Sequence, residues 1–280
     1  MRQSAEDIAR LREAFDRNAG TYDGVFSKNP LAREMRARTW QLMDSLFAPG
    51  SSILDLGCGT GEDALHMARR GVSVRAVDLS AGMVDQVRRK AAAAGVGERV
   101  RCEVGDYSKI RGCPGEYDGM YSNFGALNCV ADMGWLGDLA RRVLKPGAPL
   151  VLVLMSRFYP LEFAANILKG RFRTSTARWR PAPGARIGGI EVRVHYHRLG
   201  VVRRALAPHC TLEHSEALCL FMPVPGLDHL NARFADGFRL FRPLDLWLGR
   251  RWPMSGLGDH FMSVWRLGSE GHDEETRLTL

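Results

Sequence analysis

The stretch ILDLGCGTG at residues 53–61 decides the fold of this chain. It opens as an apolar run typical of a buried strand and continues with three glycines, Gly57, Gly59 and Gly61. Glycines at this spacing allow a sharp turn and let the backbone approach a ligand closely. The positive end of a following helix would add to such a site. The stretch therefore predicts a strand, a ligand-binding loop and a helix in succession.

Outward from this stretch, short apolar runs alternate with amphipathic segments. Strands are expected at 52–56, 72–77, 100–104, 117–122 and 150–155, and helices near 61–70, 80–94 and 133–144. This alternation predicts a parallel sheet with helices on both faces. Elsewhere we expect helices at 5–18, 31–47 and 199–207, strands at 192–197, 210–221 and 260–267, and a helical insertion at 225–255.

Three carboxylates at the ends of the first three strands indicate which ligand the loop binds. Asp55 precedes the first glycine by two residues, where it suits a cationic ammonium and not a pyrophosphate. Asp78 ends the second strand, where it can accept hydrogen bonds from both hydroxyls of a ribose. Asp106 follows the third strand and can accept from the amine of an adenine, with Tyr107 beside the ring. Asp55 and the glycine spacing also disfavour a nicotinamide dehydrogenase.

The segment from residue 53 to 155 resembles the core of the class I S-adenosylmethionine-dependent methyltransferases. The resemblance covers somewhat over a third of the chain, through ILDLGCGTG (53–61), VRAVDLS (74–80), VGDY (104–107), YDGMYSNFGALN (117–128) and LKPGAPLVL (144–152). It implies an α/β, Rossmann-like sheet of seven strands, six parallel plus one antiparallel, with an N-terminal helical segment and an inserted cap. The implied cofactor is S-adenosyl-L-methionine.

The resemblance also assigns cofactor contacts residue by residue. Tyr22 belongs to the segment FDRNAGTYD (15–23), which is similar to one that closes over the cofactor in the small-molecule branch of the family. Structural alternatives remain open: Met83 and Tyr22 could be packing residues, and Asp106 and Asn123 could cap turns. The implied methionine contacts are Tyr22, Asp55, Gly57, Gly59, Asn123 and Phe124, the ribose contact is Asp78, and the adenine contacts are Leu79, Met83, Asp106 and Tyr107.

Catalytic residues are harder to identify, because a sulfonium methyl is already activated and needs mainly an aligned nucleophile in a dry pocket. A general base is required only if that nucleophile must lose a proton. His195 and His197 are the candidate bases, since both would lie on one face of the strand expected at 192–197; ordinary surface or core histidines are the alternative. The candidate acceptor-binding residues are Asn128, Phe158 and Trp179.

The net charge of +8 is concentrated in one segment, because residues 157–204 hold 11 Lys and Arg against 2 Asp and Glu. Such a cluster fits a solvated face, an anionic acceptor or an anionic membrane surface. Nucleic acid is the least favoured partner, since no recognised binding module accompanies the charge. The six cysteines form no CxxC pair and no cluster at zinc spacing, so no metal site is expected.

We expect five parts: an N-terminal helical cap (1–50), the cofactor-binding core (51–156), a lid that binds the acceptor (157–207), the final strands with a helical insertion (208–268), and a tail (269–280). Without a signal peptide or a long apolar run, a cytoplasmic location is expected. The expected function is methylation of O, N or C on a small metabolite, natural product or lipid. The alternatives are a membrane-associated lipid or quinone methyltransferase and a non-catalytic cofactor-binding scaffold. The acceptor and the oligomeric state are not set by the sequence.

Overall fold

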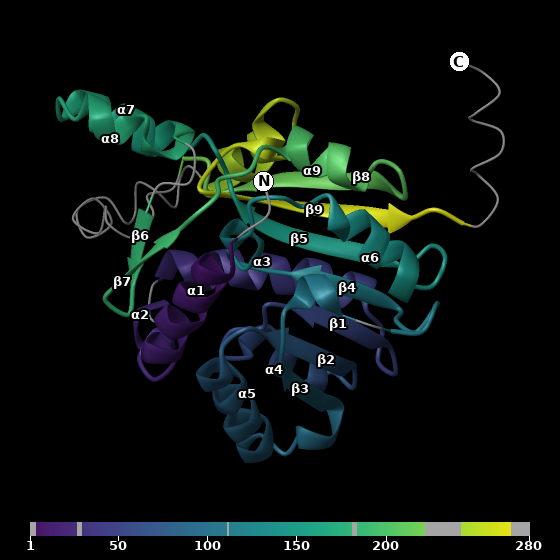
Figure 1. The fold of residues 1–280 in the computed structure, drawn as a ribbon. Helices are drawn as coiled ribbons and strands as arrows, with labels where there is room; N and C mark the ends of the chain where they lie inside the picture. Colours follow the sequence, from purple (N-terminus) through teal and green to yellow (C-terminus); the bar gives the residue numbers. More distant parts are fainter. Residues whose placement is uncertain (1–3, 27–29, 111, 181–183, 222–241, 270–280) are drawn as a thin grey trace.

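A seven-stranded sheet forms the centre of the molecule (Figure 1). The computed structural model describes residues 4–26, 30–110, 112–180, 184–221 and 242–269. The strand order is β3-β2-β1-β4-β5-β9-β8. The strands are β1 (Ser52–Leu56), β2 (Ser73–Asp78), β3 (Val100–Val104), β4 (Gly119–Ser122), β5 (Pro149–Met155), β8 (Cys210–Leu218) and β9 (His260–Leu267).

The direction of the strands confirms the predicted sheet. Strands β1 to β5 pair in parallel, whereas β9 is antiparallel to both of its neighbours, β5 and β8. Six strands therefore share one direction and β9 alone opposes them. The order reverses on either side of β1, and open α/β sheets bind ligands at the carboxyl ends of the strands at such a point.

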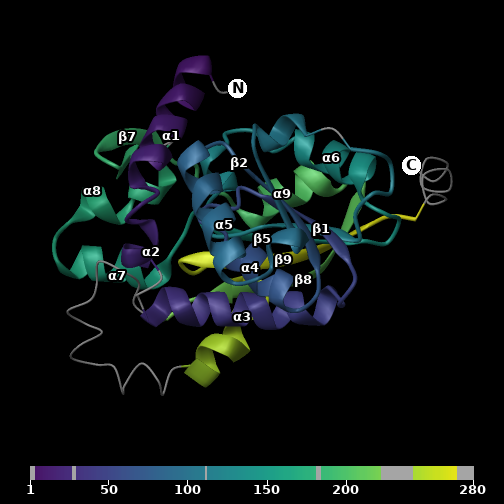
Figure 2. The same ribbon diagram turned by 90° about the horizontal axis from the view of Figure 1, so that it is seen from below.

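Helices cover both faces of this sheet because side chains alternate along each strand. One face packs on α6 (Trp135–Val143) and α9 (Leu199–Leu206), and the other packs on α3 (Pro30–Leu46), α4 (Glu62–Arg69) and α5 (Ala81–Ala93). In β1, Leu54 points to the first of these cores and Ile53 to the second. Figure 2 shows α3 beside α4, with α6 on the other side of the strands.

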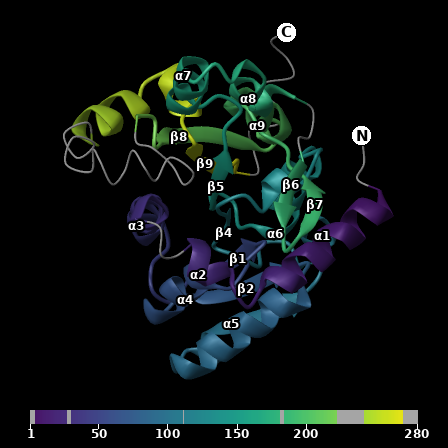
Figure 3. The ribbon, with the colours of Figure 1, turned by 90° about the vertical axis from the view of Figure 1, so that its left-hand side faces the viewer.

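The remaining elements gather at the carboxyl end of the parallel strands. Helix α1 (Ala5–Asn18) packs against the hairpin of β6 (Gly184–Ile187) and β7 (Ile190–Arg193), as Figure 3 shows, and α2 (Tyr22–Phe26) follows it. Leu11, Ala14 and Val192 form the small core between helix and hairpin. Helices α7 (Pro160–Leu168) and α8 (Phe172–Ser175) extend from the same end of the sheet (Figure 1).

The prediction of a strand at 192–197 is wrong. The observed strand is Ile190–Arg193, and it pairs with β6 in a separate two-stranded sheet. The backbone of His195 cannot join a strand ladder, because its N–H donates to the carbonyl of Asn128 and its own carbonyl accepts from the Asn128 side chain, both at 2.6 Å. His195 and His197 therefore do not share the face of a strand.

Two other expectations concern the end of the chain. Strand β8 ends at Leu218, three residues before the expected boundary. Of the helical insertion expected at 225–255, residues 242–249 are helical, whereas residues up to 241 lie outside the described ones. The expected tail also lies outside them from residue 270 onward. Among the helices that the structure describes, none has both the length and the apolar composition of a membrane span.

Candidate active site

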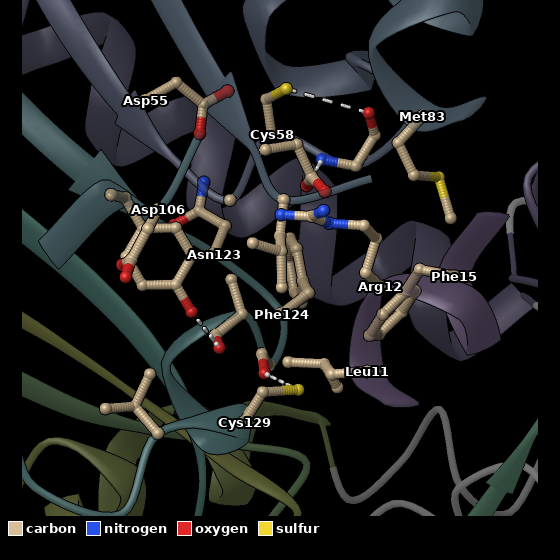
Figure 4. Close-up of a pocket in the computed structure, with 18 of the residues that line it drawn as sticks. Leu11, Arg12, Phe15, Asp55, Cys58, Met83, Asp106, Asn123, Phe124 and Cys129 are labelled. Carbon is tan, nitrogen blue, oxygen red and sulfur yellow. Dashed lines mark hydrogen bonds between the residues drawn. The ribbon is translucent and has the colours of Figure 1, made fainter. Parts of the chain in front are cut away.

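A cavity of about 760 Å³ lies at the carboxyl ends of the strands. Its volume is in the range of sites for small molecules. The structure brings all the residues that the sequence assigned to the cofactor into the lining of this cavity (Figure 4). These residues are Tyr22, Asp55, Gly57, Gly59, Asp78, Leu79, Met83, Asp106, Tyr107, Asn123 and Phe124.

The glycine loop forms one wall of the cavity, and it has no room for a side chain at Gly57. This residue has a φ of 79°, and a Cβ built on it would lie 2.3 Å from the Cβ of Ala126. Its N–H donates to the carbonyl of Val77 at 2.8 Å, which ties the loop to the end of β2. At Gly57 the loop therefore brings main-chain atoms, and not a side chain, to the cavity.

Two buried groups at the end of β1 and β4 fit a bound ammonium. Asp55 is 2% exposed and accepts a hydrogen bond from the Tyr121 hydroxyl at 2.9 Å. Burial, followed by the charge of Asp63, raises the pKa of Asp55. The side-chain oxygen of Asn123 is buried and makes no hydrogen bond within the described part of the chain. A buried acceptor without a donor costs free energy, so both groups favour a ligand that supplies N–H donors and positive charge.

Asp78 is placed for a ribose. Its two carboxylate oxygens accept from the N–H groups of Gly59 and Ser80, each at 2.9 Å, which fixes the carboxylate at the cavity wall. Burial raises the pKa of Asp78. Since a carboxylate oxygen can accept more than one hydrogen bond, both oxygens keep capacity for ligand hydroxyls.

The adenine end is formed by Asp106 and Tyr107. Asp106 caps the short 3-10 helix η2 (Tyr107–Lys109), accepting from the N–H of Ser108 at 3.0 Å and its hydroxyl at 2.6 Å. Although burial acts to raise it, these bonds and the Lys109 ammonium lower the pKa of Asp106. The Tyr107 hydroxyl donates to the carbonyl of Ala126 at 2.9 Å, which holds the ring in place. Asp106 thus caps the 3-10 helix and also lines the cavity.

Arg36 and Asp63 belong to the same site, and the sequence analysis missed both. Arg36 of α3 donates to Asp63 of α4 at 3.1 Å, and its guanidinium lies 5.1 Å from the centre of the Phe124 ring. Asp63 also accepts from Trp40 at 2.7 Å and from Asn123 at 2.9 Å. This network depends on how α3, which precedes the glycine loop, packs against α4. The spacing of residues in the sequence therefore does not predict it.

Beyond the cofactor residues the cavity wall becomes mainly apolar. Helix α1 contributes Ile8, Leu11 and Phe15 to it, and the hairpin segment contributes Ile187 and Val194. Arg12, also on α1, projects its guanidinium into the same space (Figure 4). This part of the cavity can therefore hold an apolar molecule, with one cation available to an anionic group.

The two candidate bases, His195 and His197, lie outside the cavity lining that the structure describes. His197 is 6% exposed, and its Nε2 lies 3.3 Å from the carbonyl of Leu127. Burial lowers the pKa of His197 and of His195. His197 therefore packs against the backbone of Leu127, outside the described lining of the cavity.

The three candidate acceptor contacts also lie outside the described lining. Asn128 is fully buried and joins two chain segments, because its side chain accepts from Met155 N–H at 2.9 Å besides donating to His195. Phe158 and Trp179 pack against Phe163, each at 5.5 Å between ring centres, and lie 6.0 Å from each other. These aromatic residues mount α7 and α8 on the molecule and do not face the cavity.

A buried pair lies behind Phe124. His260 Nδ1 is 2.8 Å from a carboxylate oxygen of Asp259, and the His260 ring meets the Phe124 ring at 5.9 Å between centres. Asp259 also pairs with Arg178 at 2.6 Å. Although burial opposes it, the charges of His260 and Arg178 lower the pKa of Asp259. The pair supports one side of Phe124, whose surroundings also include Arg36 of α3.

Known proteins match this chain in sequence and in fold. Residues 53–147 match the model of a methyltransferase domain family. The chain is 30% identical over 150 residues to the ubiquinone/menaquinone biosynthesis C-methyltransferase UbiE of Geotalea daltonii, over 52% of this chain and 63% of that protein. It is 32% identical over 169 residues to the demethylmenaquinone methyltransferase of Beutenbergia cavernae, over 57% of this chain and 68% of that protein.

The solved structure of the CcbJ methyltransferase from Streptomyces caelestis shares the fold, with a TM-score of 0.61 at 19% identity over 91% of this chain and 98% of that one. The chain spans less than two thirds of the length of several curated relatives, including the Geotalea protein. The match to the Beutenbergia protein exceeds that share. This chain belongs to the class I S-adenosylmethionine-dependent methyltransferase family.

Proposed function

We propose that this protein transfers a methyl group from S-adenosylmethionine to a small, largely apolar acceptor, either a metabolite, a natural product or a lipid. The observation that carries the proposal is the composition of one cavity. It combines the whole set of cofactor residues predicted from the sequence with an apolar wall from α1 and the β6–β7 hairpin. One space thus offers room for donor and acceptor side by side.

The residues present fit this cofactor. Asp55 and the side-chain oxygen of Asn123, which has no donor among the described residues, would accept from the ammonium of its methionine part. Asp78 would accept from the ribose hydroxyls, while Asp106 and Tyr107 would hold the adenine. When bound, the cofactor supplies a methyl group that its sulfonium has already activated. The protein then contributes placement and exclusion of water, and placement alone can supply a large part of the barrier reduction.

The acceptor is proposed from the chemistry of the wall. Leu11, Phe15 and Val194 favour an apolar body, and Arg12 favours an anionic or strongly polar group on it. The names of the two relatives described above refer to ubiquinone, menaquinone or demethylmenaquinone, and this supports a lipid-like acceptor. Since the described lining contains no histidine, we propose transfer by alignment without a histidine base.

A methyl-transfer assay tests the proposal. The protein is incubated with cofactor labelled on its methyl group and with prenylated quinols, aromatic phenols and long-chain acids as acceptors. We expect label in at least one apolar acceptor, and we expect Arg12→Gln to raise KM selectively for acceptors that carry an anionic group. Cofactor binding without transfer to any acceptor would favour the non-catalytic scaffold instead.

A further inference from the structure

The end of the α7–α8 unit carries large apolar side chains that face solvent. Leu168 is 88% exposed, Phe172 65% and Trp179 41%. We call the surface formed by these residues with Lys169, Arg171, Arg173 and Arg180 the α7–α8 tip. Surface apolar residues scattered singly are ordinary, but three large ones within twelve residues mark an interaction surface.

The charge of the α7–α8 tip has one sign. Residues 163–190 contain no Asp or Glu, and Lys169, Arg171, Arg173 and Arg180 are all exposed. Arg178 differs from them, because it is turned inward to pair with Glu162 and Asp259. Of these basic residues, Arg178 thus anchors the segment, whereas the other four face outward.

The α7–α8 tip is firmly mounted. The Phe163 ring stacks on Trp179, the Phe158 ring packs against both at a tilt, and the Arg157 guanidinium donates to the Trp179 carbonyl at 2.8 Å. Arg178 also donates to the carbonyl of Asp259 at 3.1 Å, at the start of β9. These contacts fix the segment in place, so Leu168 and Phe172 remain exposed in the folded protein unless a partner covers them.

The α7–α8 tip lies at the same end of the molecule as the elements that form the apolar wall of the cavity. In Figures 1 and 3, α7 and α8 stand out from the sheet, at the end where α1 and the β6–β7 hairpin also lie. These last two elements form the apolar wall of the cavity. A partner held by the tip would therefore lie at the same end of the molecule as the acceptor space.

We propose that the α7–α8 tip docks on the surface of an anionic lipid bilayer. Its four cations match anionic headgroups, and its apolar side chains can enter the boundary between headgroups and acyl chains. A protruding tip with apolar residues among cations suits a bilayer better than an acidic protein, which would need a shaped apolar pocket for each residue. The inference is independent of methyl transfer, because docking requires neither cofactor nor acceptor.

Vesicle flotation tests this proposal on the whole 280-residue chain. Vesicles of phosphatidylcholine mixed with phosphatidylserine should bind the wild type at low salt, and pure phosphatidylcholine vesicles should not. Arg171→Gln/Arg173→Gln should weaken binding about 30-fold, because two engaged cations are lost. Leu168→Ser/Phe172→Ser should weaken it at least about tenfold at unchanged charge.

A matched control separates the tip from a general basic effect. Arg203→Gln/Arg204→Gln removes two exposed cations from α9, within the same basic stretch of sequence, and should bind vesicles like the wild type. All variants change exposed residues, so each should keep the wild-type melting temperature. The proposal is overturned if the wild type does not bind at low salt or if the α9 variant loses as much as the tip variant. It also fails if Leu168→Ser/Phe172→Ser binds normally, which would assign the charges to a soluble polyanion or an acidic protein.

Discussion

The ionised form of the Asp55 carboxylate is unfavourable in the free protein and becomes favourable when a cation binds beside it. It is buried, a second carboxylate at Asp63 lies close enough to raise its pKa further, and its described hydrogen bond comes from the neutral hydroxyl of Tyr121. A ligand ammonium would reverse this balance, because an adjacent positive charge stabilises the ionised form. Cofactor binding and the ionisation of Asp55 are therefore linked.

This linkage predicts the pH dependence of cofactor affinity. Because the pKa of Asp55 is raised in the free protein, some of the protein carries a neutral Asp55 at acid pH and binds an ammonium poorly. Affinity for S-adenosylhomocysteine should rise as pH increases through that raised pKa and then level off. Calorimetry between about pH 5 and about pH 8 measures this. Asp55→Asn should bind weakly with little pH dependence, and a wild type whose affinity is flat over this range would contradict the assignment.

Two glycines in the same loop should differ in how they respond to an added methyl group. At Gly57 a Cβ would meet Ala126 at 2.3 Å, whereas at Gly59 nothing lies within 4 Å. Both have positive φ, so Gly59→Ala should lose about 1 kcal/mol of stability through strain and Gly57→Ala clearly more. Denaturant unfolding compares them. Because the Gly59 methyl group would enter ligand space, cofactor affinity should fall in a variant that still folds. Equal stability of the two variants would count against the crowding described at Gly57.

At the scale of elements, the α1 helix and the β6–β7 hairpin are the parts of the cap that line the cavity. Helices α7 and α8 belong to the same inserted segment but contribute nothing to the described lining. The sequence predicts a lid over residues 157–207. Within that range, the residues that line the cavity are Ile187 and Val194, which belong to the hairpin segment and not to α7 or α8.

Hydrogen exchange can separate these two parts of the inserted segment. Binding of S-adenosylhomocysteine should slow exchange in residues 5–18 and 184–194, since both close on the ligand. Residues 160–175 should exchange at the same rate with and without ligand. Protection confined to residues 160–175 would instead assign the closing part of the lid to α7 and α8.

Elements defined by local pattern were predictable, and those defined by distant contacts were not. Strands β1, β3 and β9 begin and end where the sequence placed them, because each is an apolar or alternating run beside a turn signal. The end of β7 depends on Asn128, which lies 67 residues from His195 and takes its backbone hydrogen bonds. In the site, the carboxylates at strand ends were visible in the sequence, whereas the contact of Arg36 with Asp63 depends on how α3 packs.

Across the whole molecule, Glu216 joins three distant parts of the chain. On β8 it is 2% exposed, and it pairs with Arg38 of α3 and, at 2.7 Å, with Arg250, which follows the helical residues 242–249. His214 Nε2 lies 3.4 Å from the same carboxylate. Although burial acts to raise it, these partners lower the pKa of Glu216 to about 2. The residues of this ion cluster are not among those that line the cavity, and we expect the cluster to stabilise the fold.

The cluster predicts a stability that depends on pH. Because the folded-state pKa is depressed, the stabilisation is complete above the unfolded value of about 4.3 and is lost as pH falls through about 2. Glu216→Gln should cost about 3 kcal/mol at neutral pH, and its difference from the wild type should shrink below about pH 4. The control is Glu213→Gln, on the same strand, whose exposed pair with Arg266 should contribute less than about 1 kcal/mol. Equal unfolding free energies for the two variants would contradict this account.

The central claim is that one cavity binds S-adenosylmethionine through Asp78 and its neighbours, and calorimetric titration with S-adenosylhomocysteine tests it most directly. The wild type should bind at micromolar strength, and Asp78→Ala, if it melts like the wild type, should lose about 2 kcal/mol or more from the charge-assisted bonds to the ribose. NAD should give no binding heat under the same conditions. Wild-type affinity in Asp78→Ala, or a preference for NAD over S-adenosylhomocysteine, would contradict the claim.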